Sequence, residues 1–196
     1  QSSAPYASGH RNIAVGTQAN YTLSTGEDNI GIGHQANYEN RVGSDNVSMG
    51  SYAGYNLLGN GTTAIGYESS RYASGSSNTF LGYRAGRGGT TSAPFSSGQY
   101  NVAMGYQALD AFTTGNKNTA IGSFNQSAIT TGYENTSVGY QTLYTMTTGY
   151  WNTAVGTQAG YANLTGQRNV FVGQWAGRYE DNSYNTYIGY EAGQGN

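Results

Sequence analysis

An alternation of apolar and small residues recurs along almost the whole chain. The repeating unit reads G-x-x-N-[TVI]-x-[VILM]-G-x-x-A, and we call its second glycine the marker glycine. The eleven marker glycines are Gly16, Gly33, Gly50, Gly66, Gly82, Gly105, Gly122, Gly139, Gly156, Gly173 and Gly189. They lie 16 or 17 residues apart, except for a gap of 23 residues after Gly82. Side chains two positions apart share one face of a strand, so each unit predicts one short β-strand bounded by glycine.

Three columns of equivalent residues make up these strands. The β-branched column stands three residues before each marker glycine and comprises Ile13, Ile30, Val47, Thr63, Thr79, Val102, Thr119, Thr136, Thr153, Val170 and Thr186. The apolar column stands directly before the marker glycine and comprises Val15, Ile32, Met49, Ile65, Leu81, Met104, Ile121, Val138, Val155, Val172 and Ile188. The small column lies between them and comprises Ala14, Gly31, Ser48, Ala64, Phe80, Ala103, Ala120, Ser137, Ala154, Phe171 and Tyr187.

The bulk of these side chains suggests which face is buried. We expect the apolar column, including Ile32, Ile65, Ile121, Val138 and Val155, to point into the interior together with the β-branched column. The small column should then face outward and let a neighbouring backbone approach. Phe80 and Phe171 would anchor that lateral contact.

Asparagine and glycine mark the corners of each unit. Asparagine stands four residues before the marker glycine in ten units, and Thr62 replaces it in the eleventh. A second glycine, the corner glycine, stands three residues before this asparagine in ten units, from Gly9 to Gly166. Two glycines per unit predict two tight turns with positive φ, and so much glycine and β-branched residue disfavours helix. We therefore predict an all-β fold, a single parallel β-solenoid over residues 1–196 with about eleven coils of 16–17 residues and a ladder of stacked asparagines.

The segments that lead into the strands resemble those of a known group of repeats. Thr113-Thr114-Gly115 precedes Asn118-Thr119-Ala120-Ile121-Gly122, and Thr147-Thr148-Gly149 precedes Asn152-Thr153-Ala154-Val155-Gly156. These motifs resemble the repeats in head domains of trimeric autotransporter adhesins and in bacteriophage tail fibres. The resemblance implies a left-handed parallel β-roll, commonly trimeric, with a non-enzymatic role in attachment at a cell or virion surface.

A longer period divides the chain into two super-repeats, residues 1–89 and 90–196. Residues 1–9 repeat the segment 90–98, and residues 190–196 match residues 83–89, so joining one end to the other would reproduce the 23-residue gap. This match predicts head-to-tail stacking in which Tyr187, Ile188 and Gly189 are covered by Ala4, Pro5 and Tyr6 of a neighbour. Alternatively, the 196 residues are part of a longer array, or the matched ends are duplication scars on a discrete shaft.

Composition narrows the functional classes. Only 9% of residues are charged, the net charge is −2, and there is no cysteine. Nucleic-acid binding normally needs a basic excess, and no segment is apolar over the roughly 18 residues that span a membrane. His10 and His34 occupy different coil positions outside any catalytic motif, and the carboxylates near the asparagines alternate with basic residues. We therefore expect no enzyme activity, no cofactor, no metal site, no nucleic-acid partner and no membrane insertion.

Two columns of tyrosine could bind a partner. Tyrosine stands directly after the marker glycine at Tyr67, Tyr83, Tyr106, Tyr140 and Tyr190. Five residues after the marker glycine stand Tyr21, Tyr38, Tyr55, Tyr144 and Tyr161, with Arg71, Arg87 and Arg178 at the same position. Exposed tyrosine and arginine suit sugar rings or a protein surface. The alternative is that they stack on one another to stabilise the ladder, or form subunit contacts.

Three functional hypotheses follow from these observations. The first is an extracellular structural and adhesive fibre whose subunits stack on one another. The second is a phage tail-fibre segment that recognises a host-surface glycan. The third, an ice- or crystal-binding protein, would need a flat outward Thr-x-Thr face, and it is disfavoured because we expect the threonines to point inward.

Overall fold

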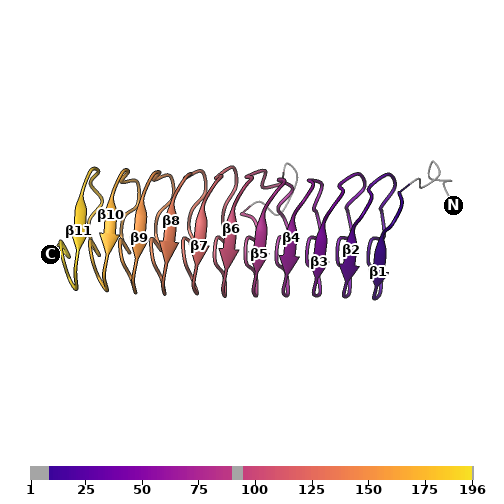
Figure 1. Cartoon of the computed structure of the whole chain (residues 1–196), viewed down its shortest axis with the longest axis horizontal. Helices are drawn as coiled ribbons and strands as arrows, with labels where there is room; N and C mark the ends of the chain where they lie inside the picture. The colour runs from indigo at the N-terminus through magenta and orange to yellow at the C-terminus, as the bar shows by residue number, and fades with distance from the viewer. Residues whose placement is uncertain (1–8, 90–94, 196) are drawn as a thin grey trace.

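The computed structural model describes residues 9–89 and 95–195, which form a parallel β-solenoid without a helix. Each coil contributes one three-residue strand to a single sheet, and the strands follow one another in chain order along the rod (Figure 1). The strands are β1 (Ile13–Val15), β2 (Ile30–Ile32), β3 (Val47–Met49), β4 (Thr63–Ile65), β5 (Thr79–Leu81), β6 (Val102–Met104), β7 (Thr119–Ile121), β8 (Thr136–Val138), β9 (Thr153–Val155), β10 (Val170–Val172) and β11 (Thr186–Ile188). The predicted fold class is confirmed.

The strands pair in register, so equivalent residues of successive coils stack directly on one another. This register continues across the 23-residue gap, where Thr79 of β5 pairs with Val102 of β6. A parallel bridge between Ala73 and Ser96 rejoins the chain to the stack before β6 begins. The additional residues therefore leave the ladder uninterrupted.

The two faces of the sheet are the reverse of our expectation. The small column points into the coil, where Ala64, Ala103, Ala120 and Ala154 are fully buried. The apolar column faces outward: Ile121 is 38% exposed, Val138 37% and Val155 39%, while Ile32 and Ile65 are half-buried. Phe80 and Phe171 are likewise fully buried and anchor no lateral contact.

The narrow interior explains this reversal. A methyl group at Gly31 would lie 2.4 Å from the side-chain oxygen of Asn20 on the opposite wall of the coil. The space between the walls therefore admits one large side chain or two small ones, and a complete column of Ile and Val would overfill it.

The interior of a coil is filled jointly by the side chain of the small column and by the side chain of the residue six positions later. Where the small column carries Phe80 or Phe171, the residue six positions later is Gly86 or Gly177, and a methyl group there would lie 2.3 or 2.4 Å from the ring. Where the small column carries Ala103, the residue six positions later is Leu109, which is fully buried. In these coils a ring is paired with glycine and alanine with leucine, whereas at Ala154 and Gly160 the space is filled by Phe171 and Leu143 of the neighbouring coils.

The two kinds of glycine are needed for different reasons. Marker glycines have φ between +123° and +138°, as predicted. Corner glycines have no positive φ in the described chain, so that part of the prediction was wrong. They are needed because the next coil approaches closely: a methyl group at Gly26 would lie 2.2 Å from the carbonyl oxygen of Gly43, and one at Gly132 would lie 2.4 Å from that of Gly149.

The asparagine column forms the predicted ladder, and its hydrogen bonds also reach the backbone. Asn118 Oδ1 accepts from the backbone N–H of Asn135 at 3.1 Å, and its Nδ2 donates to the carbonyl oxygen of Gly132 at 2.9 Å. Thr62 keeps the same pattern with a longer contact, because its Oγ1 accepts from the N–H of Asn78 at 3.3 Å. Buried polar groups are satisfied in this way from coil to coil.

Candidate functional site

The outer face of the sheet combines an exposed apolar column with a column of threonine, valine and isoleucine. It consists of the apolar and β-branched columns of β1–β11, which we call the outer strand face. Exposed fractions along it include 38% for Met49, 41% for Leu81 and 37% for Met104. Six members of the β-branched column are threonine, and these strand positions also point outward, contrary to our expectation. A largely apolar face that runs along the strands of a rod is typical of an interaction surface.

The second tyrosine column forms stacks of parallel rings. Tyr21 and Tyr38 stack with ring centroids 5.2 Å apart, and Tyr38 and Tyr55 with centroids 4.9 Å apart. Tyr144 and Tyr161 stack in the same way at 5.3 Å. Tyr38 is therefore covered on both faces and offers a ligand only its edge, whereas Tyr21 at the end of its stack is 61% exposed. Burial, the largest cause, raises the pKa of Tyr55.

The arginines of this column join tyrosines and carboxylates. The Arg71 guanidinium lies 4.5 Å from the ring centroid of Tyr52 and 5.7 Å from that of Tyr55. It also forms an ion pair with Glu68, a nearly buried carboxylate whose other oxygen lies 2.8 Å from Nε of Arg84. The Arg71 guanidinium is therefore already bound by tyrosine rings and a carboxylate of the same chain.

The remaining arginines of the column, Arg87 and Arg178, also contact side chains of the same chain. Arg87 Nε lies 3.0 Å from an oxygen of Asp110, whose pKa is raised chiefly by burial, against the attraction of Arg87. Arg178 lies over the rings of Trp175 and Tyr179, at 5.2 and 5.0 Å. Arg71 and Arg87 thus link one coil to the next, whereas the ring contacts of Arg178 stay within its own coil.

Sequence reasoning missed a third column, which directly precedes the asparagine in each coil. From β6 to β11 it carries Tyr100, Lys117, Glu134, Trp151, Arg168 and Tyr184, and we call it the corner column. All six residues have positive φ, between 53° and 65°, which turns each side chain outward at the corner before the strand. The only sequence signal was the alternation of carboxylates and basic residues near the asparagines, from which we inferred no interaction.

Neighbouring members of the corner column interact along the rod. Lys117 Nζ donates to Glu134 at 2.9 Å, and Trp151 Nε1 donates to the other Glu134 oxygen at 2.5 Å. These hydrogen bonds, with that from Lys117 the larger cause, lower the pKa of Glu134. The Arg168 guanidinium lies 4.4 Å from the Trp151 ring centroid and 5.2 Å from that of Tyr184.

The predicted assembly ends are only partly visible. Ala4, Pro5 and Tyr6 lie outside the described residues. Ile188 is 69% exposed, Gly189 is exposed, and Tyr187 is half-buried with its ring stacked on Phe171 at 5.9 Å. Among the described residues, β1 pairs only with β2, and β11 only with β10.

The described residues lack a metal-binding cluster and a membrane-spanning helix. They contain no group of three or more histidine or carboxylate side chains that could hold a metal ion. None of their segments forms a helix of the length and apolarity that crossing a membrane requires. Comparison with protein-family models, with curated proteins and with solved structures finds no match.

Proposed function

We propose that this chain is a non-enzymatic structural protein of an extracellular fibre, on a cell-surface appendage or a virion, and that its principal partner is another copy of itself. The observation that carries the proposal is the outer strand face, whose apolar side chains are exposed in a single chain. Covering such a face with protein removes apolar area from water and stabilises the assembly.

The shape of this face suits lateral association between rods. At about 4.8 Å per coil, eleven coils give two straight ladders on the order of 50 Å long. Copies placed side by side can match many apolar residues at once without any change in backbone conformation. The resemblance to trimeric adhesin repeats agrees with a side-by-side arrangement, with three chains sharing an axis.

Head-to-tail stacking is the second contact that we propose. It is supported by the internal junction between β5 and β6, where a 23-residue spacing leaves the strand ladder in register. The same spacing would arise between Gly189 of one copy and Gly16 of the next. A longer array within one polypeptide would place the same residues together, and electron microscopy of the purified chain distinguishes filaments from discrete short rods.

Adsorption of the outer strand face to a crystal surface is the second candidate function. The outward threonine ladder of Thr119, Thr136 and Thr153 favours it, because flat hydroxyl rows at a regular spacing suit an ordered surface. The neighbouring column offers only apolar side chains of differing size. Ice crystals grown in solutions of the protein would become faceted if this function is correct and would remain round discs if it is wrong.

Sedimentation velocity tests the leading proposal. Val138→Asp places a charge in the outer strand face, whereas Leu164→Asp places one at a comparably exposed residue outside it, since the two side chains are 37% and 44% exposed. We expect Val138→Asp to reduce lateral assemblies to single rods and Leu164→Asp to leave them intact, with unchanged circular dichroism in both. Equal association of the two variants would contradict the proposal.

A further inference from the structure

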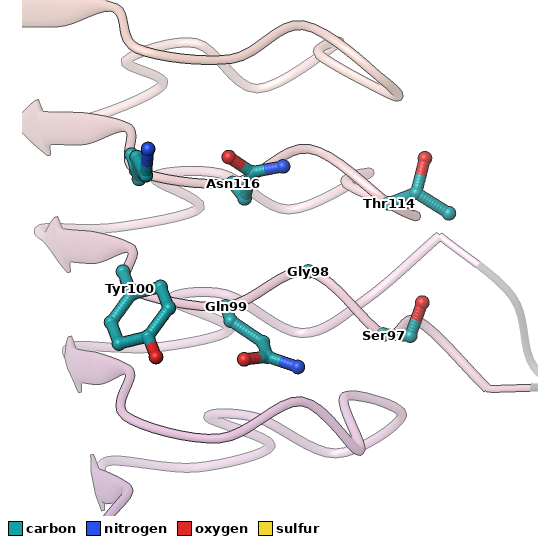
Figure 2. A pocket seen from close by; sticks show the side chains of 7 residues that line it. Ser97, Gly98, Gln99, Tyr100, Thr114 and Asn116 are labelled. Atoms are coloured by element: carbon teal, nitrogen blue, oxygen red, sulfur yellow. The ribbon is translucent and has the colours of Figure 1, made fainter.

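A shallow cavity of about 300 Å³ opens at the corner that precedes β6 and β7. Its walls come from two successive coils, Ser97, Gln99 and Tyr100 from one and Thr114, Asn116 and Lys117 from the next. Figure 2 shows the amide side chains of Gln99 and Asn116 in the middle, with Tyr100 on one side and the hydroxyls of Ser97 and Thr114 on the other. The volume is at the lower end of the range for small-molecule sites.

The side-chain amides of Gln99 and Asn116 have no hydrogen-bond partner among the described residues. In some other coils the residue two positions before the asparagine is bonded to its neighbour: Glu27 N–H donates to Ser44 Oγ at 3.0 Å, and Asn60 N–H donates to Ser76 Oγ at 3.0 Å. Within the described ranges, neither the side chains nor the backbone N–H groups of Gln99 and Asn116 make such a bond. The corner thus presents unpaired donors and acceptors side by side.

The ring of Tyr100 is also free. It is 59% exposed, and no other ring in the described part of the chain stacks on it. By contrast, Tyr83 is stacked between Tyr67 and Tyr106, at 5.4 and 4.9 Å. Tyr100 therefore offers an unstacked aromatic ring beside the amides of Gln99 and Asn116.

The charge of the cavity is balanced. Its one cationic group, Lys117, is paired with Glu134 at 2.9 Å, and this hydrogen bond is the largest cause of the raised pKa of the Lys117 amine. An anionic ligand would have to compete with Glu134 for that amine. A neutral ligand with many hydroxyl groups avoids this competition and can use the amides and hydroxyls directly.

We propose that this cavity binds a neutral oligosaccharide, with one sugar ring packed on Tyr100 and its hydroxyl groups bonded to Gln99, Asn116 and Thr114. A pyranose ring has an apolar C–H face and a polar hydroxyl rim, and an aromatic face beside unpaired amides complements both. The cavity lies at the corner rather than on the outer strand face, so the site does not depend on the proposed self-association.

Saturation-transfer NMR tests the site with four neutral probes: chitotriose, cellotriose, maltotriose and mannotriose. We expect the intact chain to bind at least one of them. Tyr100→Ala should weaken that binding about tenfold through loss of the ring face, and Asn116→Ala about fivefold through loss of hydrogen bonds. Tyr184→Ala is the matched control, because Tyr184 occupies the same column and is 67% exposed.

Three results would overturn the proposal. They are absence of transfer to all four probes, equal binding by the intact chain and Tyr100→Ala, and equal losses in Tyr100→Ala and Tyr184→Ala. Circular dichroism confirms that each variant remains folded. Val138→Asp should bind as the intact chain does, so failure of self-association and failure of sugar binding are separate results.

Discussion

Exchanging the residues of one core pair tests how this narrow solenoid is filled. Phe171 is fully buried against Gly177, and a methyl group at Gly177 would lie 2.4 Å from the ring. Two coils of the same protein use the opposite solution, in which Ala103 faces Leu109 and Ser137 faces Leu143. The double variant Phe171→Ala/Gly177→Leu should therefore convert the β10 coil to the pattern of the β6 coil.

The expected magnitudes follow from the local geometry. Phe171→Ala should cost about 3–5 kcal/mol, because the adjoining glycines have no side chain to fill the cavity. Gly177→Leu alone should cost about 3 kcal/mol or more, from overpacking against the ring and from a side chain at positive φ. Leu109 and Leu143 have φ of 53° and 49°, so leucine is compatible with this backbone. In the double variant we expect a favourable coupling of about 2–3 kcal/mol.

Urea unfolding followed by circular dichroism measures this coupling. The free energies of unfolding of the intact chain, both single variants and the double variant form a double-mutant cycle. The reasoning predicts that the double variant is more stable than the sum of the single losses. If the losses simply add, the ring and the glycine do not share one space, and the proposed core complementarity is wrong.

Three further predictions concern other elements of the coil. Asn118→Ala should lower the free energy of unfolding by about 2–4 kcal/mol, because it leaves the buried N–H of Asn135 without an acceptor. Asn118→Thr should lose less, because a threonine hydroxyl can still accept from that N–H, and thermal unfolding compares the two variants. Gly132→Ala should be similarly destabilising despite its ordinary φ, and a wild-type midpoint would contradict the close approach of the next coil. Burial raises the folded-state pKa of Asp110 above its ordinary 3.8 despite the attraction of Arg87. Between pH 3.8 and that raised pKa the folded state binds more protons than the unfolded state, so the contribution of Asp110 to the free energy of unfolding falls as pH rises. Asp110→Asn should remove this pH dependence from urea unfolding measured across the same pH range.

The period of the sequence was sufficient to predict the solenoid. Glycine, asparagine and β-branched residues recur together, and residues stacked in a parallel ladder must recur at one spacing. The asparagine ladder was predictable for the same reason, since each coil repeats a polar residue at a buried corner. The continuity of the register through the 23-residue gap also agrees with the pattern.

The direction of the side chains could not be obtained from the same pattern. The alternation of side chains along a strand predicts that Ala120 and Ile121 lie on opposite faces. Because burying a larger apolar side chain is more favourable, we expected Ile121 to be the buried one. In this coil the wall opposite the strand is so close that the alanine fits inside and the isoleucine lies outside. The distance between the strand and the opposite wall is set by the closed coil and cannot be deduced from the strand alone.

The candidate binding residues were predicted only in part. Tyr21 and Tyr38 stack on one another, which agrees with the alternative that these rings stabilise the ladder; their role in binding stays a prediction. Tyr100 was overlooked because its column mixes residue types, and its importance depends on a cavity formed with the next coil. A site made by two coils at one corner leaves no repeated sequence signal.

Protection of a single thiol tests the central claim, that copies of the chain associate through the outer strand face. The chain has no cysteine, so Val138→Cys and Leu164→Cys each introduce one unique thiol, at residues 37% and 44% exposed in the single chain. We predict that maleimide labelling of the Val138→Cys thiol slows as protein concentration rises, whereas labelling of the Leu164→Cys thiol does not. Equal labelling rates for the two thiols at every concentration would contradict the account.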